Sequence, residues 1–162
     1  MMMKNKQKGA VLIVSMIMLL LLTLLAVSSM NTTIMEEKIT SNYKDKNTAF
    51  QAAEAALRNG ETYLRDITPI PWFGDTNGLY QPTNAGAPRW NQVTWSDAAQ
   101  VISYAGLDGV ADQPNYIIEE LPIIVVKPEV GVEYTNRFYR VTTEAVGASK
   151  TAMVKLQSVY KK

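Results

Sequence analysis

The sequence predicts an α+β fold in which one long N-terminal helix packs against a C-terminal antiparallel β-sheet. Three observations predict it. The run from Ala10 to Met30 contains no charge, proline or glycine. No proline interrupts residues 36–66, which follow it. From Asn115 onwards, β-branched residues and a period of two replace the helical pattern.

The first half of the predicted helix has the length and composition of a membrane span. About 20 apolar residues in a helix extend roughly 30 Å, the thickness of the bilayer hydrocarbon. Leu, Ile and Val fill 12 of the 21 positions from Ala10 to Met30, which favours insertion by roughly 4 to 7 kcal/mol. Its three serines and one threonine do not offset this, because a helical hydroxyl can bond its own backbone. We therefore expect residues 10–35 to cross a membrane.

The flanking charges predict the orientation of this span. Lys4, Lys6 and Lys8 precede it, and Glu36 and Glu37 are the first charges after it. Because an excess of lysine stays on the cytoplasmic side, we expect a cytoplasmic N-terminus and an exported C-terminal part. That part has about 130 residues, enough for one small domain.

Three interpretations of the N-terminus are open. A cleaved secretory signal would end near Ala26-Val27-Ser28, but its apolar core would exceed the usual length. An uncleaved signal anchor is the second. The third depends on Gly9, which separates the lysines from the apolar run: Lys8-Gly9-Ala10 resembles the class III signal of type IV pilins and related pseudopilins. The resemblance implies that a prepilin peptidase removes a leader of residues 1–9 between Gly9 and Ala10 and methylates Ala10.

Val14 departs from the pattern of that family. Most pilins carry Glu at this fifth mature position, where its carboxylate pairs with the terminal amine of a neighbouring subunit. An unpaired ammonium in hydrocarbon is costly, and Val14 provides no partner for it. Some minor pilins share this absence, so the resemblance favours a low-copy initiating subunit over a bulk fibre subunit.

The composition excludes several classes of chemistry. The chain has no His and no Cys, which rules out Cys–His pairs, His-containing triads, zinc sites of Cys and His, and disulfides. With 16 basic and 15 acidic residues its net charge is +1, which does not suggest binding to nucleic acid. We expect no cofactor, no nucleic-acid partner and no enzymatic activity.

Residues 36–66 are predicted to continue the helix as an amphipathic segment with one buried face. Lys46 and Gly60 interrupt its apolar series, and its alanines form a narrow surface that permits close approach of a sheet. An unbroken helix from Ala10 to Asp66 would reach about 85 Å, a length that suits a fibre with a helical core. The apolar series is Ile39, Tyr43, Phe50, Ala53, Leu57 and Leu64.

The segment from Pro69 to residue 110 is predicted to be mostly loop. Pro69-Ile70-Pro71-Trp72 ends the helix, since a residue before proline avoids helical geometry. We predict a loop over residues 69–95 and a short helix over 98–104, capped by Ser96-Asp97. Loops of this length in a small domain are usually functional or variable.

Two kinds of candidate site lie in this middle segment. Asp75-Thr76-Asn77-Gly78 is similar to the start of a calcium loop, and Asp108 with Asp112 forms a second acidic cluster, but polar turns are favoured for both because the remaining ligands are missing. Tryptophans beside Arg89 could stack on single-stranded DNA, although packing is favoured because no basic run accompanies them. The tryptophans are Trp72, Trp90 and Trp95.

The C-terminal part is predicted to form a sheet over residues 115–160. Strands are expected at 116–121 and 123–126, followed by a hairpin of 134–146 and 151–160 around Gly147-Ala148-Ser149. Alternation in both hairpin arms predicts one covered and one wet face. We expect the alanine-rich face of the helix to cover the sheet.

The whole chain resembles a type IV pilus minor pilin of the PilX kind. The likeness rests on the leader and on four later segments: Met35-Glu36-Glu37-Lys38, Ala49 to Arg58, Tyr116-Ile117-Ile118-Glu119 and Tyr139-Arg140-Val141-Thr142.

This resemblance implies a subunit held in the inner membrane, with residues 36–162 as its periplasmic domain, which is later incorporated into the pilus. Its partners would be other minor pilins, the major pilin and a tip adhesin, in a complex that primes assembly. Glu36 and Glu37 mark the membrane boundary or pair with neighbouring subunits, and Phe50 and Leu57 are further candidate contacts. The alternatives are a type II secretion pseudopilin and a signal-anchored periplasmic binding domain that does not polymerise.

Overall fold

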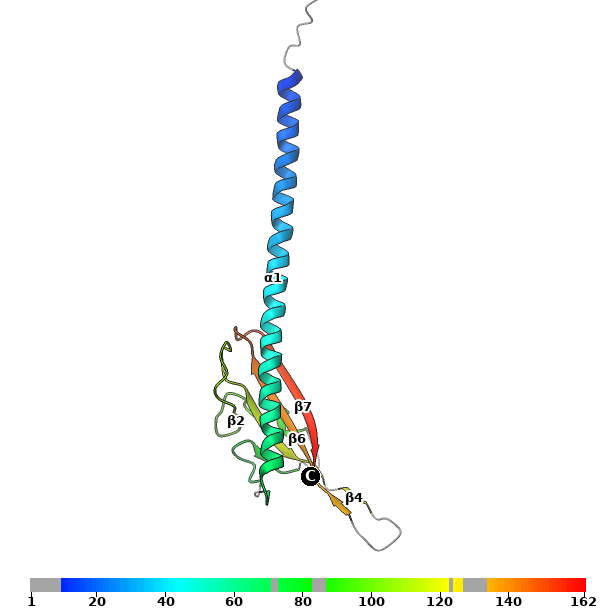
Figure 1. Ribbon diagram of the computed structural model, residues 1–162, viewed down its shortest axis with the longest axis vertical. Helices are drawn as coiled ribbons and strands as arrows, with labels where there is room; N and C mark the ends of the chain where they lie inside the picture. The colour runs from blue at the N-terminus through cyan, green and yellow to red at the C-terminus, as the bar shows by residue number, and fades with distance from the viewer. Residues whose placement is uncertain (1–9, 71–72, 83–86, 123, 127–133) are drawn as a thin grey trace, which may run out of the picture. The chain divides into compact units, whose positions relative to one another are not determined.

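The computed structural model describes residues 10–70, 73–82, 87–122, 124–126 and 134–162. It contains two compact units, Met1–Asn42 and Tyr43–Lys162, and each is considered by itself below. The predicted leader with Gly9, and also Trp72, lie outside the described residues. The elements (Figure 1) are α1 (Ala10–Asp66), β1 (Leu79–Tyr80), η1 (Arg89–Asn91), β2 (Ile102–Ser103), β3 (Asn115–Glu120), β4 (Ile124–Val126), β5 (Tyr134–Asn136), β6 (Phe138–Val146) and β7 (Met153–Lys161).

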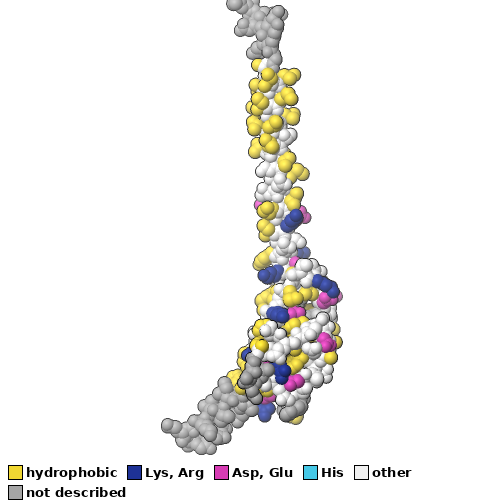
Figure 2. Space-filling model, turned by 180° about the vertical axis from the view of Figure 1, so that it is seen from behind, with side chains coloured by type: hydrophobic (Ala, Val, Ile, Leu, Met, Phe, Trp, Pro, Cys, Tyr) yellow, Lys and Arg dark blue, Asp and Glu magenta, His cyan; other side chains and the backbone are white. Residues whose placement is uncertain are grey.

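The unbroken helix predicted over residues 10–66 is confirmed as α1. In the first unit its apolar side chains are all exposed, and the helix is long and apolar enough to cross a membrane. On the face seen in Figure 2, hydrophobic side chains cover the N-terminal part of α1. Hydroxyls in this unit bond back to the helix: Ser15 Oγ to Leu12 O at 2.9 Å, Thr23 Oγ1 to Leu20 O at 2.8 Å, and the Thr32 and Thr33 hydroxyls to Ser28 O and Ser29 O. These polar groups are therefore satisfied without external partners.

In the second unit the alanine-rich face of α1 packs on the sheet, as expected. The buried positions follow helical spacing, and most of their side chains are small. They lie against a core in which Tyr116, Ile118, Tyr139 and Val141 are buried and Phe73 meets Tyr139 edge to face at 5.8 Å. The buried helical residues are Ala49, Ala52, Ala53, Ala56, Gly60 and Leu64.

The predicted composition of the buried face was partly wrong. Tyr43 and Phe50, predicted to be buried, are 75% and 45% exposed, and Leu57 is half-buried. Gly60, interpreted as an interruption, is buried instead: a Cβ there would lie 2.7 Å from Val141 Cγ1 and 3.2 Å from Tyr116 Cδ2. Because the sheet contributes bulky side chains, the helix face against it needs small ones.

The main sheet is mixed, with strand order β1-β3-β6-β7 and β2 also paired with β3. The predicted hairpin is confirmed: β6 and β7 are antiparallel, from Val146 opposite Met153 to Phe138 opposite Lys161. The predicted first arm, 134–146, is two strands. Residues before Arg137 pair with β4 in a separate two-stranded sheet, whereas those after it pair with β3 and β7.

The prediction of one wet face holds for β7 but is wrong for β3. Along β7, half-buried and exposed residues alternate. On β3, Ile117 and Glu119 are buried on the face opposite Tyr116 and Ile118. Residues of the middle segment cover them, namely Tyr80, Trp90, Val93, Trp95 and Val101.

The middle segment is more ordered than predicted. Its predicted loop, 69–95, includes β1, which pairs in parallel with β3, and the short helix η1. The helix predicted over residues 98–104 is absent. Asp97 does cap a turn, with Oδ1 accepting from Ala99 N at 3.0 Å, but Ile102 then pairs with Tyr116 in β3. A helix over these residues would prevent that pairing.

Polar contacts tie both ends of the β6–β7 hairpin to α1. At the turn, the Asp45 carboxylate accepts from Ser149 N at 3.1 Å and from the Ser149 hydroxyl. At the other end, Lys162 Nζ donates to Leu64 O at 2.7 Å and also to Ile67 O. This lysine satisfies carbonyls that the end of a helix leaves free.

Replacing Gly60 with alanine is expected to lower the midpoint of thermal unfolding. Alanine favours a helix by about 1 kcal/mol over glycine, but overpacking against the buried, branched Val141 costs about 1–3 kcal/mol. Near-UV circular dichroism of the full chain in detergent micelles would follow the globular part. Gln51→Ala, at an exposed position of the same helix, is the control and should leave the midpoint unchanged. A higher midpoint for Gly60→Ala would contradict the packing described here.

The contact between Asp45 and Ser149 at the hairpin turn is expected to weaken at acid pH. Hydrogen bonds from the Ser149 hydroxyl and backbone N–H hold the pKa of Asp45 below its ordinary value of 3.8. A lowered carboxyl pKa stabilises the fold above pH 3.8, and this contribution disappears as the pH falls through the folded pKa. Ser149→Ala should therefore raise the pKa of Asp45, measured by carbon NMR of the carboxyl group. The remote Ser96→Ala should not change it, and an equal pKa in all three proteins would refute this contact.

Candidate functional site

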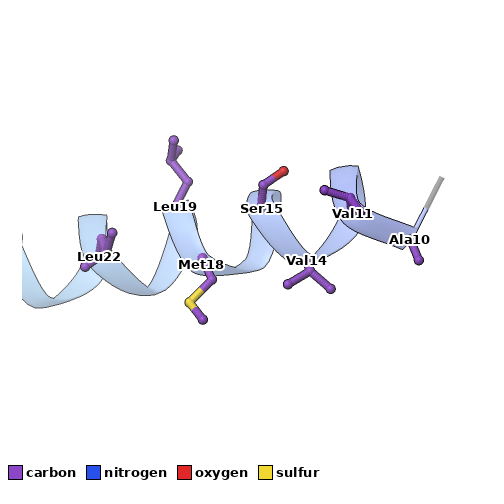
Figure 3. A pocket seen from close by; sticks show the side chains of 7 residues that line it. All are labelled: Ala10, Val11, Val14, Ser15, Met18, Leu19 and Leu22. Carbon is purple, nitrogen blue, oxygen red and sulfur yellow. The ribbon is translucent and has the colours of Figure 1, made fainter. Parts of the chain in front are cut away.

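The most distinctive surface of the first unit is an apolar groove along the start of α1. Figure 3 shows Val14 and Met18 on one side of the helix and Ser15 and Leu19 on the other. These side chains form ridges of residues four apart, and the groove runs between the ridges. Its lining consists of Ala10, Val11, Val14, Ser15, Met18, Leu19 and Leu22.

This groove has the chemistry of a packing surface. No residue that lines it has an ionisable side chain, and its one hydroxyl, on Ser15, already bonds Leu12 O. Val14 is 55% exposed and offers only methyl groups where a carboxylate would provide charge. Such a surface can be occupied by lipid or by the ridges of another helix.

The other predicted contact residues lie on exposed parts of α1. Glu36 and Glu37 are exposed, and neither makes an ion pair with any residue in the described ranges. Phe50 and Tyr43 border a shallow apolar depression with Lys46 and Asn47. Leu57 differs, because it packs against the edge of the core. Within the second unit, Phe50 and Leu57 therefore have different surroundings.

The acidic candidates in the middle segment are used internally. Asp75 Oδ1 accepts from Gln81 N at 2.8 Å, and Asp75 Oδ2 lies 3.1 Å from Arg89 Nη2. Asp112 forms an ion pair with Lys150 at 2.9 Å. Among the described residues, no group of three or more His, Cys, Asp or Glu is arranged to hold a metal ion.

Trp90 and Trp95 pack over β3 on the face opposite α1. They border the cluster that contains Ile117, and Trp95 Nε1 donates to Trp90 O at 3.2 Å. Lys155 Nζ lies 5.1 Å from the ring centroid of Trp95 and 2.9 Å from Glu144 Oε2. This arrangement agrees with the packing role that the sequence favoured for them.

Sequence reasoning missed the buried Glu119. Its side chain is 3% exposed and accepts from Arg140 Nη1 at 3.4 Å, and the two residues lie opposite each other in the β3–β6 pair. The available signal was a glutamate directly after the apolar residues Ile117 and Ile118, and an arginine, Arg140, in the first hairpin arm. The ion pair joins two neighbouring strands of the main sheet.

Tyr116 illustrates why the buried polar groups are structural. Burial raises its pKa to about 12, and its hydroxyl donates to Asn59 Oδ1 at 2.9 Å. It therefore stays protonated at neutral pH and anchors β3 to α1.

Comparison with family models matches nearly the whole chain. Residues 8–58 match the model described as PilX N-terminal, and residues 58–162 match the one described as type IV pilus assembly protein PilX C-term. Searches of curated proteins and of solved structures return no significant match.

Proposed function

Because the chain belongs to the PilX family of type IV pilus assembly proteins, it takes part in pilus assembly, and we propose that it does so as a non-catalytic minor pilin of the priming or tip complex. The observation that carries the proposal is the exposed apolar helix from Ala10 to Met30, which lies within the family match over residues 8–58. A surface of this size requires lipid or other helices around it.

We propose that residues 1–9 are a leader and that prepilin peptidase cuts between Gly9 and Ala10. The mature chain would then comprise a membrane and assembly helix, 10–35, and a periplasmic domain, 36–162, with its helix over 36–66, variable loops over 69–110 and sheet over 115–160. Removing the leader takes away three lysines, whose charge would otherwise oppose extraction of the helix from the inner membrane.

The mechanism is an exchange of environment. The groove between Val14 and Leu19 is filled by lipid while the subunit waits in the membrane, and by neighbouring pilin helices after extraction. Both environments are apolar, so the helix surface is not exposed to water during the exchange. A cytoplasmic ATPase supplies the work. Because Val14 offers no carboxylate, this subunit does not depend on the usual pairing with a neighbour's amine, which suits a low-copy initiator.

The proposed partners are other minor pilins, the major pilin and a tip adhesin. Phe50, an aromatic that is 45% exposed, is proposed as a helix contact, and Leu57, seven residues further along α1, packs at the edge of the core. Glu36 and Glu37, exposed and without ion pairs among the described residues, would attract basic groups of a neighbouring subunit. Nucleic acid is not among the proposed partners.

The N-terminus of the mature protein tests the proposed processing. Mass spectrometry of protein from piliated cells should find Ala10 first, with one methyl group. Gly9→Val should leave the leader attached and abolish piliation, whereas Gln7→Ala, in the same leader, should change neither. An intact leader in cells with normal pili, or a first residue at Ser29 or Met30, would reject the proposal and favour an anchored domain.

Reversing the charges at Glu36 and Glu37 tests the boundary contact. The double variant Glu36→Lys, Glu37→Lys should reduce pilus number, counted by electron microscopy, while the amount of protein in the membrane stays constant. Like charges placed in a subunit contact repel each other. The matched variant Glu36→Gln, Glu37→Gln should have a smaller effect, since it removes attraction without adding repulsion. Normal piliation in both variants would show that these residues only mark the membrane boundary.

A further inference from the structure

The β7 strand is a long, open edge of the main sheet. All nine of its residues pair with β6 without a bulge, and it is the outermost strand in Figure 1. Within the ranges that the structure describes, no strand pairs with its other side. On the opposite side of the sheet, by contrast, the outer edge of β3 is occupied by β1 and β2.

The hydrogen-bond alternation identifies which backbone groups face this open edge. Gly147 N donates to Ala152 O at 2.9 Å, and Lys162 N donates to Arg137 O at 3.0 Å, so the even-numbered residues of β7 bond to β6. In an antiparallel pair the intervening residues point their N–H and C=O groups the other way. These residues are Met153, Lys155, Gln157, Val159 and Lys161, which span roughly 27 Å of strand.

The side chains of β7 would favour a particular kind of neighbour. On the face toward α1, Val154 and Leu156 are only half-buried and could be covered further. On the other face Val159 is 60% exposed. Residues 153–162 include three lysines and no acidic residue. Lys155 shares its charge with Glu144 at 2.9 Å, and Lys162 Nζ donates to Leu64 O, so the positive charge of this partly apolar edge is greatest at Lys161.

We propose that β7 binds an extended segment of another protein in which apolar and acidic residues alternate. The segment would add a strand to the sheet through main-chain bonds. Its apolar side chains would lie beside Val154 and Leu156, and its carboxylates beside Lys155 and Lys161. A second copy of β7 fits less well, because it would bring lysines together across the new strand pair. This binding goes beyond the proposed function and does not depend on removal of the leader.

Several features make this edge available for pairing. Sheet edges are commonly protected by proline, a bulge, short length or lysine side chains. Of these devices β7 has the lysines, which would oppose a basic strand and attract an acidic one. The β7 strand is nine residues long, contains no proline and pairs in uninterrupted register. Both of its ends are held, by the Asp45–Ser149 contact and by Lys162 on Leu64 O, so little further order is lost when a partner pairs.

The test uses the full chain in detergent micelles and a labelled ten-residue peptide of alternating Val and Glu. Fluorescence anisotropy should detect its binding, and a matched peptide of Val and Lys should bind at least about tenfold more weakly at low salt. The Val–Glu peptide with alternate N-methylated amides should not bind, because it lacks the donors that strand pairing requires. Equal binding of the two charged peptides, or no binding by the Val–Glu peptide, would overturn the proposal.

Variants of β7 locate the binding. Gln157→Pro removes an N–H that faces the edge, a substitution that edge strands tolerate, and should weaken binding by about tenfold or more, with near-UV circular dichroism as the check of folding. Val159→Glu and Val159→Lys place opposite charges at one exposed position of β7. This matched pair tests whether the peptide binds along β7 even if the proline variant unfolds. The first should weaken binding several-fold, and the second should preserve it. If Val159→Glu and Val159→Lys changed peptide binding equally, the proposed acidic partner would be refuted. It would also be refuted if the chain dimerised through β7 and Gln157→Pro abolished the dimer.

Discussion

The close approach of α1 to the sheet at Gly60 is the contact on which the globular unit depends. A side chain at this position would meet Val141 Cγ1 at 2.7 Å, so backbone and sheet are in direct contact there. The alanines on the same face continue this narrow surface, and Tyr116 and Tyr139 fill the core around it. Small-residue packing of this kind is sensitive to single methyl groups. A chain without cysteine has no disulfide to support this packing.

The same contact explains why α1 has two kinds of apolar surface. The inner face of residues 49–64 consists mostly of small side chains, whereas Tyr43 and Phe50 lie outside it and stay exposed. In the first unit every large apolar side chain from Val11 to Met30 is exposed. Within the fold, the sheet covers only the small-residue face of α1. The larger side chains require partners from outside the chain, and family membership in pilus assembly provides a setting in which such partners exist.

Local patterns in the sequence predicted the helices and strands better than they predicted how these elements pack together. Absence of proline and helical spacing predicted α1, and alternation predicted the β6–β7 hairpin, because both are short-range signals. The role of Gly60 was missed, since hydrophobicity gives no weight to a residue buried for its small volume. Asp97 capped a turn as its chemistry suggests, but pairing of Ile102 with Tyr116 prevented a helix. Burial of Ile117 beneath Trp90 and Trp95 likewise depends on contacts between segments that are distant in the chain. For the candidate site, the pattern predicted the long apolar helix that is exposed in the structure, whereas the contact of Asp45 and the edge of β7 depend on topology.

Two interfaces of different character follow from this arrangement. Packing of apolar helices depends on shape and tolerates many sequences, so the groove beside Val14 offers little discrimination among pilin helices. Strand pairing along β7 depends on main-chain register and on the signs of neighbouring charges. A subunit that entered a fibre of helices and also bound one particular partner, as we propose, would need both properties. The contacts of Asp45 and Lys162 fix the two ends of the hairpin, and a strand held in this way presents its free hydrogen-bonding groups in a fixed geometry. Selectivity would therefore come from the sheet edge, whereas the helix would supply most of the buried area.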